Sequence, residues 1–311
     1  MSIRRTIHAP PQAYRTAELI QAGVHPKRLG AKDIRRVGRG LLLHPDLAFD
    51  DFSYRDRCIA IGMTLKQEFF LSRRSAAVLH GIPCSPHPQG LVDVASFSPQ
   101  RAPRHRRIAG HRVKSGVLQW TERAGLTIPS AGDVWCQLGA ITTLPELVAA
   151  GDFLTSGERI PGSGGARTTP LCTIEDLRGA HDRHRTTLGA PLRTRALALI
   201  RAPVDSPPES HLRVALINAG FAEPTVNCPV PTARRIFHAD LGYPELRIAI
   251  EYEGRYHFTS AEQARFDVQR RRSMIEAGWT VLQALDSDVD DPRSFFTTLA
   301  RAIQSARSRL R

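Results

Sequence analysis

The stretch Leu246-Arg247-Ile248-Ala249-Ile250-Glu251-Tyr252-Glu253 decides how the last third of this 311-residue sequence folds. Its short, nearly continuous apolar run is typical of a strand that is buried on both faces of a sheet. The run ends in two carboxylates, Glu251 and Glu253. We therefore expect a central strand whose end carries acidic side chains.

Helices and strands alternate around this central strand. The predicted order is helix, strand, turn, strand, helix and strand, over residues 210–220, 236–240, 242–244, 246–253, the segment from Asp267 to Gly278, and 279–283. This alternation favours an α/β sheet with helices packed against it. Glu209 then falls in the first turn of the first helix, and Asp240 ends a strand beside the central one.

These acidic residues predict a metal site. Carboxylates that are buried together are costly unless a positive group joins them. Glu209, Asp240 and Glu251 supply oxygen ligands of the kind that Mg²⁺ or Mn²⁺ accepts. Such an ion activates water and stabilises charge on a phosphate during hydrolysis.

This part of the chain resembles the PD-(D/E)XK nuclease fold, and more narrowly the endonuclease-like domain related to very-short-patch repair endonucleases. The matching residues span nearly all of 205–311 in the family's order: Glu209-Ser210, Asp240, Gly242-Tyr243-Pro244, Glu251-Tyr252-Glu253-Gly254, His257, Asp267, Arg271 and Gly278-Trp279. The resemblance implies an Mg²⁺-dependent DNA endonuclease in which Asp240 and Glu251 bind the metal.

The sequence departs from the family pattern at one position. The family has a lysine two residues after the acid of the central strand, where it positions water or stabilises the transition state. This chain has Glu253 there and no lysine after Lys114, although the related subfamily tolerates an acid. His257 or Arg271 would then supply the positive group, or Glu253 would be a further metal ligand. The catalytic candidates are Asp240, Glu251, Glu253, His257 and Arg271.

Simpler roles are open for some of these side chains. Asp267 and Arg271 stand four residues apart on a helix, where a surface ion pair contributes only about 0.2–0.5 kcal/mol. His257 suits a general base, because histidine titrates near neutral pH, and equally a local hydrogen bond in the loop after the strand. Glu253 suits a position that faces solvent.

The net charge of +13 is concentrated at the other end of the chain. Residues 1–114 hold 20 lysine and arginine residues against 8 acidic ones, whereas residues 205–311 are neutral. Such a concentration indicates a surface that binds a polyanion, and nucleic acid is the expected partner. A solvated basic surface in an arginine-rich protein is the alternative. The expected DNA contacts are Lys27, Arg28, Lys32, Arg35, Arg36, Arg39, Arg104, Arg106 and Arg107.

Two basic segments contain these contacts. Residues 14–43 are predicted to form a helix from Thr16 to Gly23, a basic helix that starts at Pro26 and carries Arg35 and Arg36, and a turn into a strand. This layout is typical of a winged helix-turn-helix. Residues 91–114 are predicted to form two strands around a basic loop, which either contacts phosphates or is the exposed tip of a hairpin.

The N-terminal part also resembles a known family. The basic winged helix, the Gly38-Arg39-Gly40 wing and the segment Leu71-Ser72-Arg73-Arg74-Ser75-Ala76-Ala77-Val78-Leu79-His80-Gly81-Ile82 resemble the AbiEi-like antitoxin domain of type IV toxin–antitoxin systems. The resemblance implies DNA binding through the winged helix. It also implies a nucleotidyltransferase-type toxin as a partner.

Composition sets the remaining expectations. No stretch approaches the roughly 20 apolar residues of a membrane span, and no apolar run follows Met1 to Arg5, so we expect a cytoplasmic protein without a secretory signal. Five scattered cysteines without a C-x-x-C pair indicate isolated thiols. The expected domains are a winged helix over 1–88, a mixed α+β region over 89–203 and the endonuclease-like α/β domain over 204–311.

The sequence leaves two functions open. One is a DNA endonuclease that acts in phage defence or in a toxin–antitoxin context. The other is a non-catalytic antitoxin or repressor that keeps the C-terminal fold as a binding platform. Charge alone does not separate DNA from RNA as the ligand, and the sequence does not indicate an oligomeric state.

Overall fold

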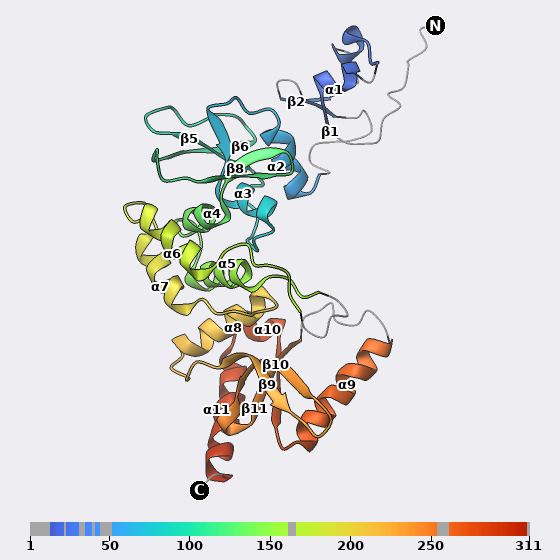
Figure 1. Ribbon diagram of the computed structural model, residues 1–311, viewed down its shortest axis with the longest axis vertical. Helices are drawn as coiled ribbons and strands as arrows, with labels where there is room; N and C mark the ends of the chain where they lie inside the picture. Colours follow the sequence, from blue (N-terminus) through green and yellow to red (C-terminus); the bar gives the residue numbers. More distant parts are fainter. Residues whose placement is uncertain are drawn as a thin grey trace. The chain divides into compact units, whose positions relative to one another are not determined.

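The computed structural model describes residues 13–21, 23–30, 35–38, 41–43, 52–160, 166–253 and 261–309. Its architecture is mixed α+β, with helices and several sheets (Figure 1). The chain forms two compact units: unit 1 comprises residues 1–138 and 183–187, and unit 2 comprises residues 139–182 and 188–311. The borders of these units differ from the expected domain boundaries at 88/89 and 203/204. The three expected domains stay a prediction.

The N-terminal segment of unit 1 forms a small sheet of strand order β1-β3-β2, namely β1 (Ala13–Arg15), β3 (Leu41–Leu43) and β2 (Arg35–Gly38). Helix α1 (Thr16–Gln21) and a 3₁₀ helix, η1 (Pro26–Gly30), lie between β1 and β2 in the chain. The first helix and the strand after Gly40 were predicted correctly. The predicted basic helix carrying Arg35 and Arg36 is wrong, because these residues pair with Leu43 and Leu42 in the sheet. Cross-strand pairing here overrides local helix propensity.

The larger part of unit 1 surrounds a second sheet of order β4-β5-β6. Its elements are α2 (Tyr54–Gly62), β4 (Phe69–Leu71), α3 (Arg73–His80), β5 (Val92–Phe97), β6 (Ile108–Val113), the hairpin β7 (Trp120–Arg123) and β8 (Leu126–Pro129), and α4 (Ala131–Leu138). Helix α3 ends at Gly81, which has φ of +74°. Strands β5 and β6 are parallel, so the alternative of a simple hairpin around the basic loop is wrong.

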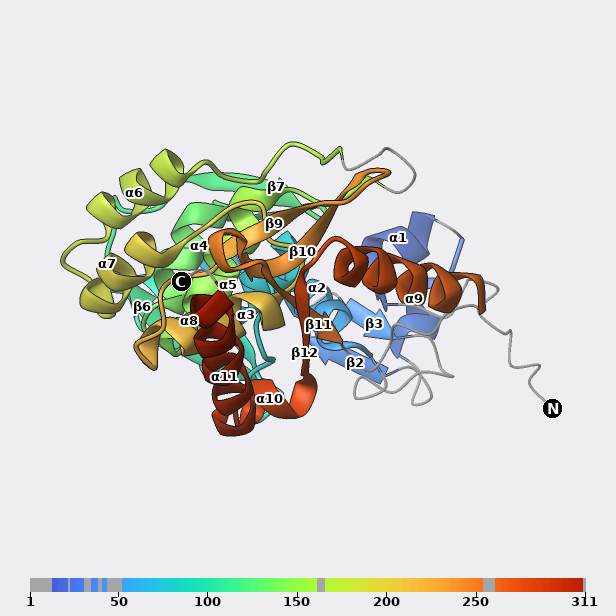
Figure 2. The same ribbon diagram turned by 90° about the horizontal axis from the view of Figure 1, so that it is seen from below.

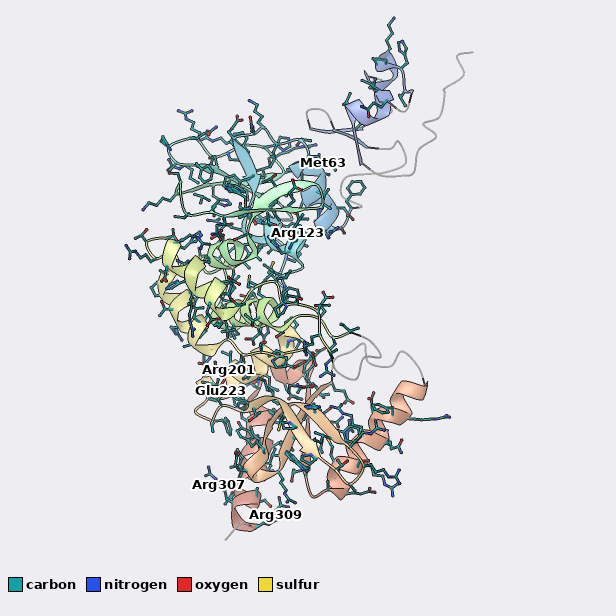
Figure 3. All side chains as sticks on the ribbon, viewed as in Figure 1. Met63, Arg123, Arg201, Glu223, Arg307 and Arg309 are labelled. Atoms are coloured by element: carbon teal, nitrogen blue, oxygen red, sulfur yellow. The ribbon has the colours of Figure 1, made fainter. Side chains whose placement is uncertain are left out.

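Four helices make up the first half of unit 2: α5 (Leu144–Ser156), α6 (Ile174–Arg183), whose last residue belongs to unit 1, α7 (Ala190–Leu199) and α8 (Pro207–Asn218). A fully buried ion pair joins α5 to α8, since Arg213 Nη2 lies 2.7 Å from Asp152 Oδ2. The other end of the Arg213 guanidinium contacts Glu223, which Arg201 also binds (Figure 3). This network fixes the position of α8 within unit 2.

The second half of unit 2 is a four-stranded sheet of order β12-β11-β10-β9. Its strands are β9 (Thr225–Pro231), β10 (Ile236–Tyr243), β11 (Ile248–Glu253) and β12 (Thr280–Leu285), with the short 3₁₀ helix η3 (Pro244–Leu246) between β10 and β11. Strand β11 pairs antiparallel with β10 and parallel with β12. The prediction of a central strand is therefore confirmed.

Helices cover both faces of this sheet, as Figures 1 and 2 show. Ile248 and Ile250 of β11 pack with residues of α8 and α11 (Arg293–Arg309), whereas Ala249 packs with Met274 of α9 (Ala261–Glu276) on the opposite face. A short helix, α10 (Asp286–Asp290), precedes α11. This alternation explains why the strand is apolar at successive positions.

Two further findings concern the cysteines and the length of the apolar helices. All five cysteines are free thiols, as the sequence predicts. In the parts of the chain that the structure describes, no helix is both long and apolar enough to cross a membrane.

Candidate functional site

A cavity of about 320 Å³ in unit 2 collects acidic side chains from four different elements. Helix α8 contributes Glu209, β10 contributes Asp240, β11 contributes Glu251 and Glu253, and α9 contributes Asp267. Two of the arginines of α9, Arg270 and Arg271, line the same space, as do Asp205, Ser206 and Gln283. Residues widely separated in the sequence thus form one mixed-charge site.

Asp240 lies where the pairing of β10 with β11 ends. The last residue pair of this ladder is Leu241 with Ile250. Asp240 and Glu251 are the next residues beyond this pair, one on each of the two neighbouring strands. The Asp240 carboxylate continues the ladder, because the backbone N–H of Tyr252 donates to its Oδ2 at 2.7 Å. Burial raises the pKa of Asp240, against the opposing effects of this hydrogen bond and the Arg270 charge.

Glu209 faces Asp240 from the first turn of α8, and Glu209 is only 6% exposed. The hydroxyl of Ser206 donates to Glu209 Oε1 at 2.7 Å, and the backbone N–H of Asp205 donates to Oε2 at 3.2 Å. Burial, and secondly the negative charge of Asp240, raise the pKa of Glu209 to about 8. The two carboxyl groups therefore resist being ionised together.

Glu251 has a cationic partner that sequence reasoning missed. Arg270 Nη1 lies 2.6 Å from Glu251 Oε2, and Arg270 Nη2 also donates to the carbonyl of His238. Burial raises the pKa of Glu251 to about 7, while Arg270 lowers it and Asp240 raises it further. The sequence shows three adjacent arginines at positions 270 to 272. Only the placement of α9 against the sheet shows that Arg270 is the one that contacts Glu251.

Glu253 and Arg271 contact each other at the edge of the cavity. Arg271 Nη2 lies 3.3 Å from Glu253 Oε1, and the Gln283 side-chain amide donates to Glu253 Oε2 at 2.8 Å. Glu253, whose side chain is 37% exposed, thus has polar partners at the cavity edge as well as contact with solvent. His257 lies outside the described residues, so its predicted role stays a prediction.

The donor chemistry of this cavity suits a divalent cation. Glu209, Asp240 and Glu251 are hard oxygen donors. Their pKa values are raised, which shows that the nearby positive charges do not offset the cost of ionising these buried carboxyl groups. Among the described residues, no group of three or more His, Cys, Asp or Glu side chains is already arranged as a set of metal ligands. Glu251 would have to exchange its Arg270 contact to join such a set.

Two arginines from the segment after α5 also lie near the cavity. Arg159 Nη2 is 2.6 Å from Asp205 Oδ2, and Arg167 contacts the other oxygen of the same carboxylate. The sequence around Arg159 and Arg167 contains no pattern that signals this placement. These two arginines thus add positive charge beside Asp205.

A second cavity, of about 400 Å³, adjoins the acidic one through Arg270, which lines both. It lies between the β9–β10 hairpin and α9, and its basic side chains are Arg234, Arg235, Arg270 and Arg272. Phe266 is 45% exposed here, and the Arg235 guanidinium lies 5.6 Å from the centre of the Phe237 ring. Although residues 205–311 are neutral as a whole, four of their arginines gather beside the acidic cavity.

The structure places the expected DNA contacts of unit 1 in two segments. Lys27 is exposed on η1, Arg28 belongs to the same 3₁₀ helix, and Arg35 and Arg36 belong to β2. Arg104 and Arg106 are exposed, and Arg107 half-buried, in the connection between β5 and β6. Lys32 and Arg39 lie outside the described residues.

Comparison with known proteins identifies relatives but no function. No protein-family model matches the chain. Two uncharacterized proteins of Mycobacterium tuberculosis, one from strain CDC 1551 / Oshkosh and one from strain H37Rv, are each 27% identical to it over 139 residues. The matched part is 44% of this chain, and the chain spans about half the length of these relatives, 51% in each case.

Proposed function

We propose that this protein is a Mg²⁺- or Mn²⁺-dependent DNA endonuclease. In this proposal unit 2 carries a PD-(D/E)XK-like site at the acidic cavity, and the basic residues of the N-terminal segment of unit 1 bind DNA. The observation that carries the proposal is the convergence of Glu209, Asp240 and Glu251 on one cavity with raised pKa values. Buried carboxyl groups with strongly raised pKa values are typical of functional sites.

The side chains of the cavity divide into two roles. Asp240, Glu251 and Glu209 would hold the cation, which when bound activates water and stabilises charge on a phosphate. Arg270 and Arg271 lie in the same cavity and orient the two carboxylates of β11 through their ion pairs. With a cation at Glu251, the Arg270 guanidinium would be available to bind a phosphate oxygen. Arg270 also connects the cavity to the basic one beside it, where the DNA backbone would lie.

A cleavage assay tests the proposal. Supercoiled plasmid and labelled oligonucleotides are incubated with the protein in Mg²⁺, in Mn²⁺ or in EDTA. The variants Asp240→Asn and Glu251→Gln are compared with Glu245→Gln, which changes an exposed residue of unit 2 outside the cavity. We expect metal-dependent cutting that only the first two variants lose. Cutting that persists in both variants would overturn the proposal.

One observation favours a second function, a non-catalytic DNA-binding repressor or antitoxin. Arg270 already forms an ion pair with Glu251 without a metal, and the chain has no lysine after Lys114 to serve the chemical step. In this case the protein binds DNA, with or without a nucleotidyltransferase-type toxin as partner. Salt-sensitive binding without cutting, unchanged in Asp240→Asn and Glu251→Gln, would support this function over the nuclease.

A further inference from the structure

Two adjoining cavities form a groove on unit 1, remote in sequence from the acidic site. Their volumes are about 660 and 550 Å³, and both are lined by Leu65, Lys66, Phe69 and Gln100. Each volume lies within the range of about 300–1,000 Å³ that is usual for ligand sites. We call this surface the unit 1 groove.

One end of the unit 1 groove is aromatic. Trp120 of β7 is 43% exposed, and its ring centre lies 5.0 Å from that of Phe70 and 6.1 Å from that of Phe97. Both phenyl rings stand nearly perpendicular to the indole, at 90° and 84°, so neither is stacked in parallel upon it. The cluster holds the indole firmly while leaving much of it accessible to a flat ligand.

The other end of the unit 1 groove is basic. Arg101 and Arg104 line it and are exposed, and among the described residues no carboxylate pairs with either. Lys66 lies between the two ends and makes a loose, exposed contact of 3.9 Å with Glu68, the one acidic residue among the described lining. The charge of the groove therefore complements a polyanion.

The basic end has a defined position in the fold. Pro103 packs so closely on β6 that a Cβ at Gly110 would lie 2.0 Å from the Pro103 carbonyl oxygen. The Ser96 hydroxyl donates to the Arg101 carbonyl at 3.2 Å. These contacts hold the loop of Arg101 and Arg104 against the sheet, which lowers the entropic cost of binding a ligand there.

We propose that the unit 1 groove binds a single-stranded polynucleotide, with an unpaired base stacked on Trp120 and neighbouring phosphates bound by Arg101 and Arg104. A positively charged groove combined with an accessible aromatic ring is the usual arrangement for single-strand binding, because every base has a face that stacks. A paired base inside a duplex does not expose that face. The proposal goes beyond the nuclease function and does not depend on the metal site of unit 2.

Binding is measured in EDTA, so that cleavage plays no part. The probes are fluorescein-labelled oligo(dT), oligo(U) and a mixed-sequence duplex, each of about 12 nucleotides per strand, within the usual range of roughly 4–16 nucleotides. Intrinsic fluorescence gives a second signal, since Trp135 and Trp279 are buried and Trp120 is the accessible indole. The variants are Trp120→Ala, Trp120→Phe and the double change Arg101→Gln with Arg104→Gln. Arg55→Gln, an exposed position on α2 that lines neither cavity, is the matched control.

We expect Trp120→Ala to weaken single-strand binding by roughly 5- to 150-fold, with a smaller loss in Trp120→Phe and none in Arg55→Gln. The double arginine variant should lower the salt slope of single-strand binding by about 0.7 for each phosphate that the protein no longer binds. The comparison of oligo(dT) with oligo(U) decides between DNA and RNA as the ligand. The proposal is overturned if the protein binds neither single strand, or if Trp120→Ala and the double arginine variant leave single-strand affinity unchanged. An equal loss of duplex affinity in these variants would also overturn it, because the groove would then be a duplex surface.

Discussion

The substitution Glu209→Gln should stabilise the protein while removing a carboxylate from the acidic cavity. Glu209 is nearly fully buried, and its pKa rises from 4.5 to about 8 because of burial and the Asp240 charge. A glutamine has a similar shape and still accepts the 2.7 Å Ser206 hydrogen bond through its amide oxygen, and loses only the longer 3.2 Å bond from the backbone N–H of Asp205. The buried position therefore stays filled, and the electrostatic cost disappears.

The magnitude follows from proton linkage. Between pH 4.5 and about 8 the folded chain binds more protons at Glu209 than the unfolded chain does, so stability falls as the pH rises. The loss is about 1.4 kcal/mol per pH unit, or about 2 kcal/mol between pH 6 and 7.5. Glu209→Gln removes this loss. Its advantage over the wild type should therefore be about 2 kcal/mol larger at pH 7.5 than at pH 6.

Calorimetric unfolding of the full chain in EDTA measures this difference. For a unit of this size, 2 kcal/mol corresponds to about 4–8 °C in Tm. Glu245→Gln, at an exposed position outside the cavity, is the control and should show no such pH-dependent gain. A gain in Glu209→Gln that is the same at both pH values, or a loss of stability at pH 7.5, would refute the reasoning. If the cavity binds Mn²⁺, the ion should raise the Tm of the wild type more than that of the variant.

Three other predictions concern different parts of the molecule. Asp152→Ala leaves the buried Arg213 guanidinium without its buried partner and should cost about 3–5 kcal/mol; an unchanged Tm would contradict this. Burial, aided by the Arg73 charge, lowers the pKa of His111 to about 3. The folded protein therefore loses stability as the pH falls below 6.5, by about 2 kcal/mol at pH 5. His111→Gln should remove that loss in urea unfolding, and an equal fall in both proteins would exclude His111 as the cause. The double change Arg234→Gln with Arg235→Gln should reduce the salt slope of duplex binding by about 0.9 for each phosphate that is no longer neutralised; an unaltered slope would show that the second basic cavity does not bind DNA.

Much of unit 2 was predictable because its elements obey local rules. A strand buried on both faces is apolar at successive positions, which identified Ile248 to Ile250. Gly278, with φ of +82°, ends α9 where the sequence indicates. The acidic residues at the strand and helix ends also signalled where polar side chains would gather. Strand β9 was less visible, since Pro229 and Pro231 within it are unusual in a strand.

Other features depend on pairings that no local pattern contains. The residues before Arg35 and Arg36 are compatible with a helix, but these two arginines pair with Leu43 and Leu42 of β3 in a sheet. The contact of Arg270 with Glu251, and of Arg159 with Asp205, depends on how α9 and a long loop lie against the sheet. Arginine is common in this chain, so composition could not single out these two. Long-range geometry, rather than residue type, decides which charges meet.

The way α8 is held has a consequence for dividing the chain experimentally. Consecutive residues of this helix serve different neighbours: Glu209 lines the acidic cavity, while the Ser210 hydroxyl donates to Asp152 of α5 at 2.6 Å. Arg213, one turn further on, is wholly enclosed and binds the same aspartate. A fragment cut at residue 204 would expose this guanidinium and remove the Asp152 contacts that help to hold the helix that presents Glu209. The smallest transplantable piece that keeps the acidic cavity in shape therefore begins ahead of α5.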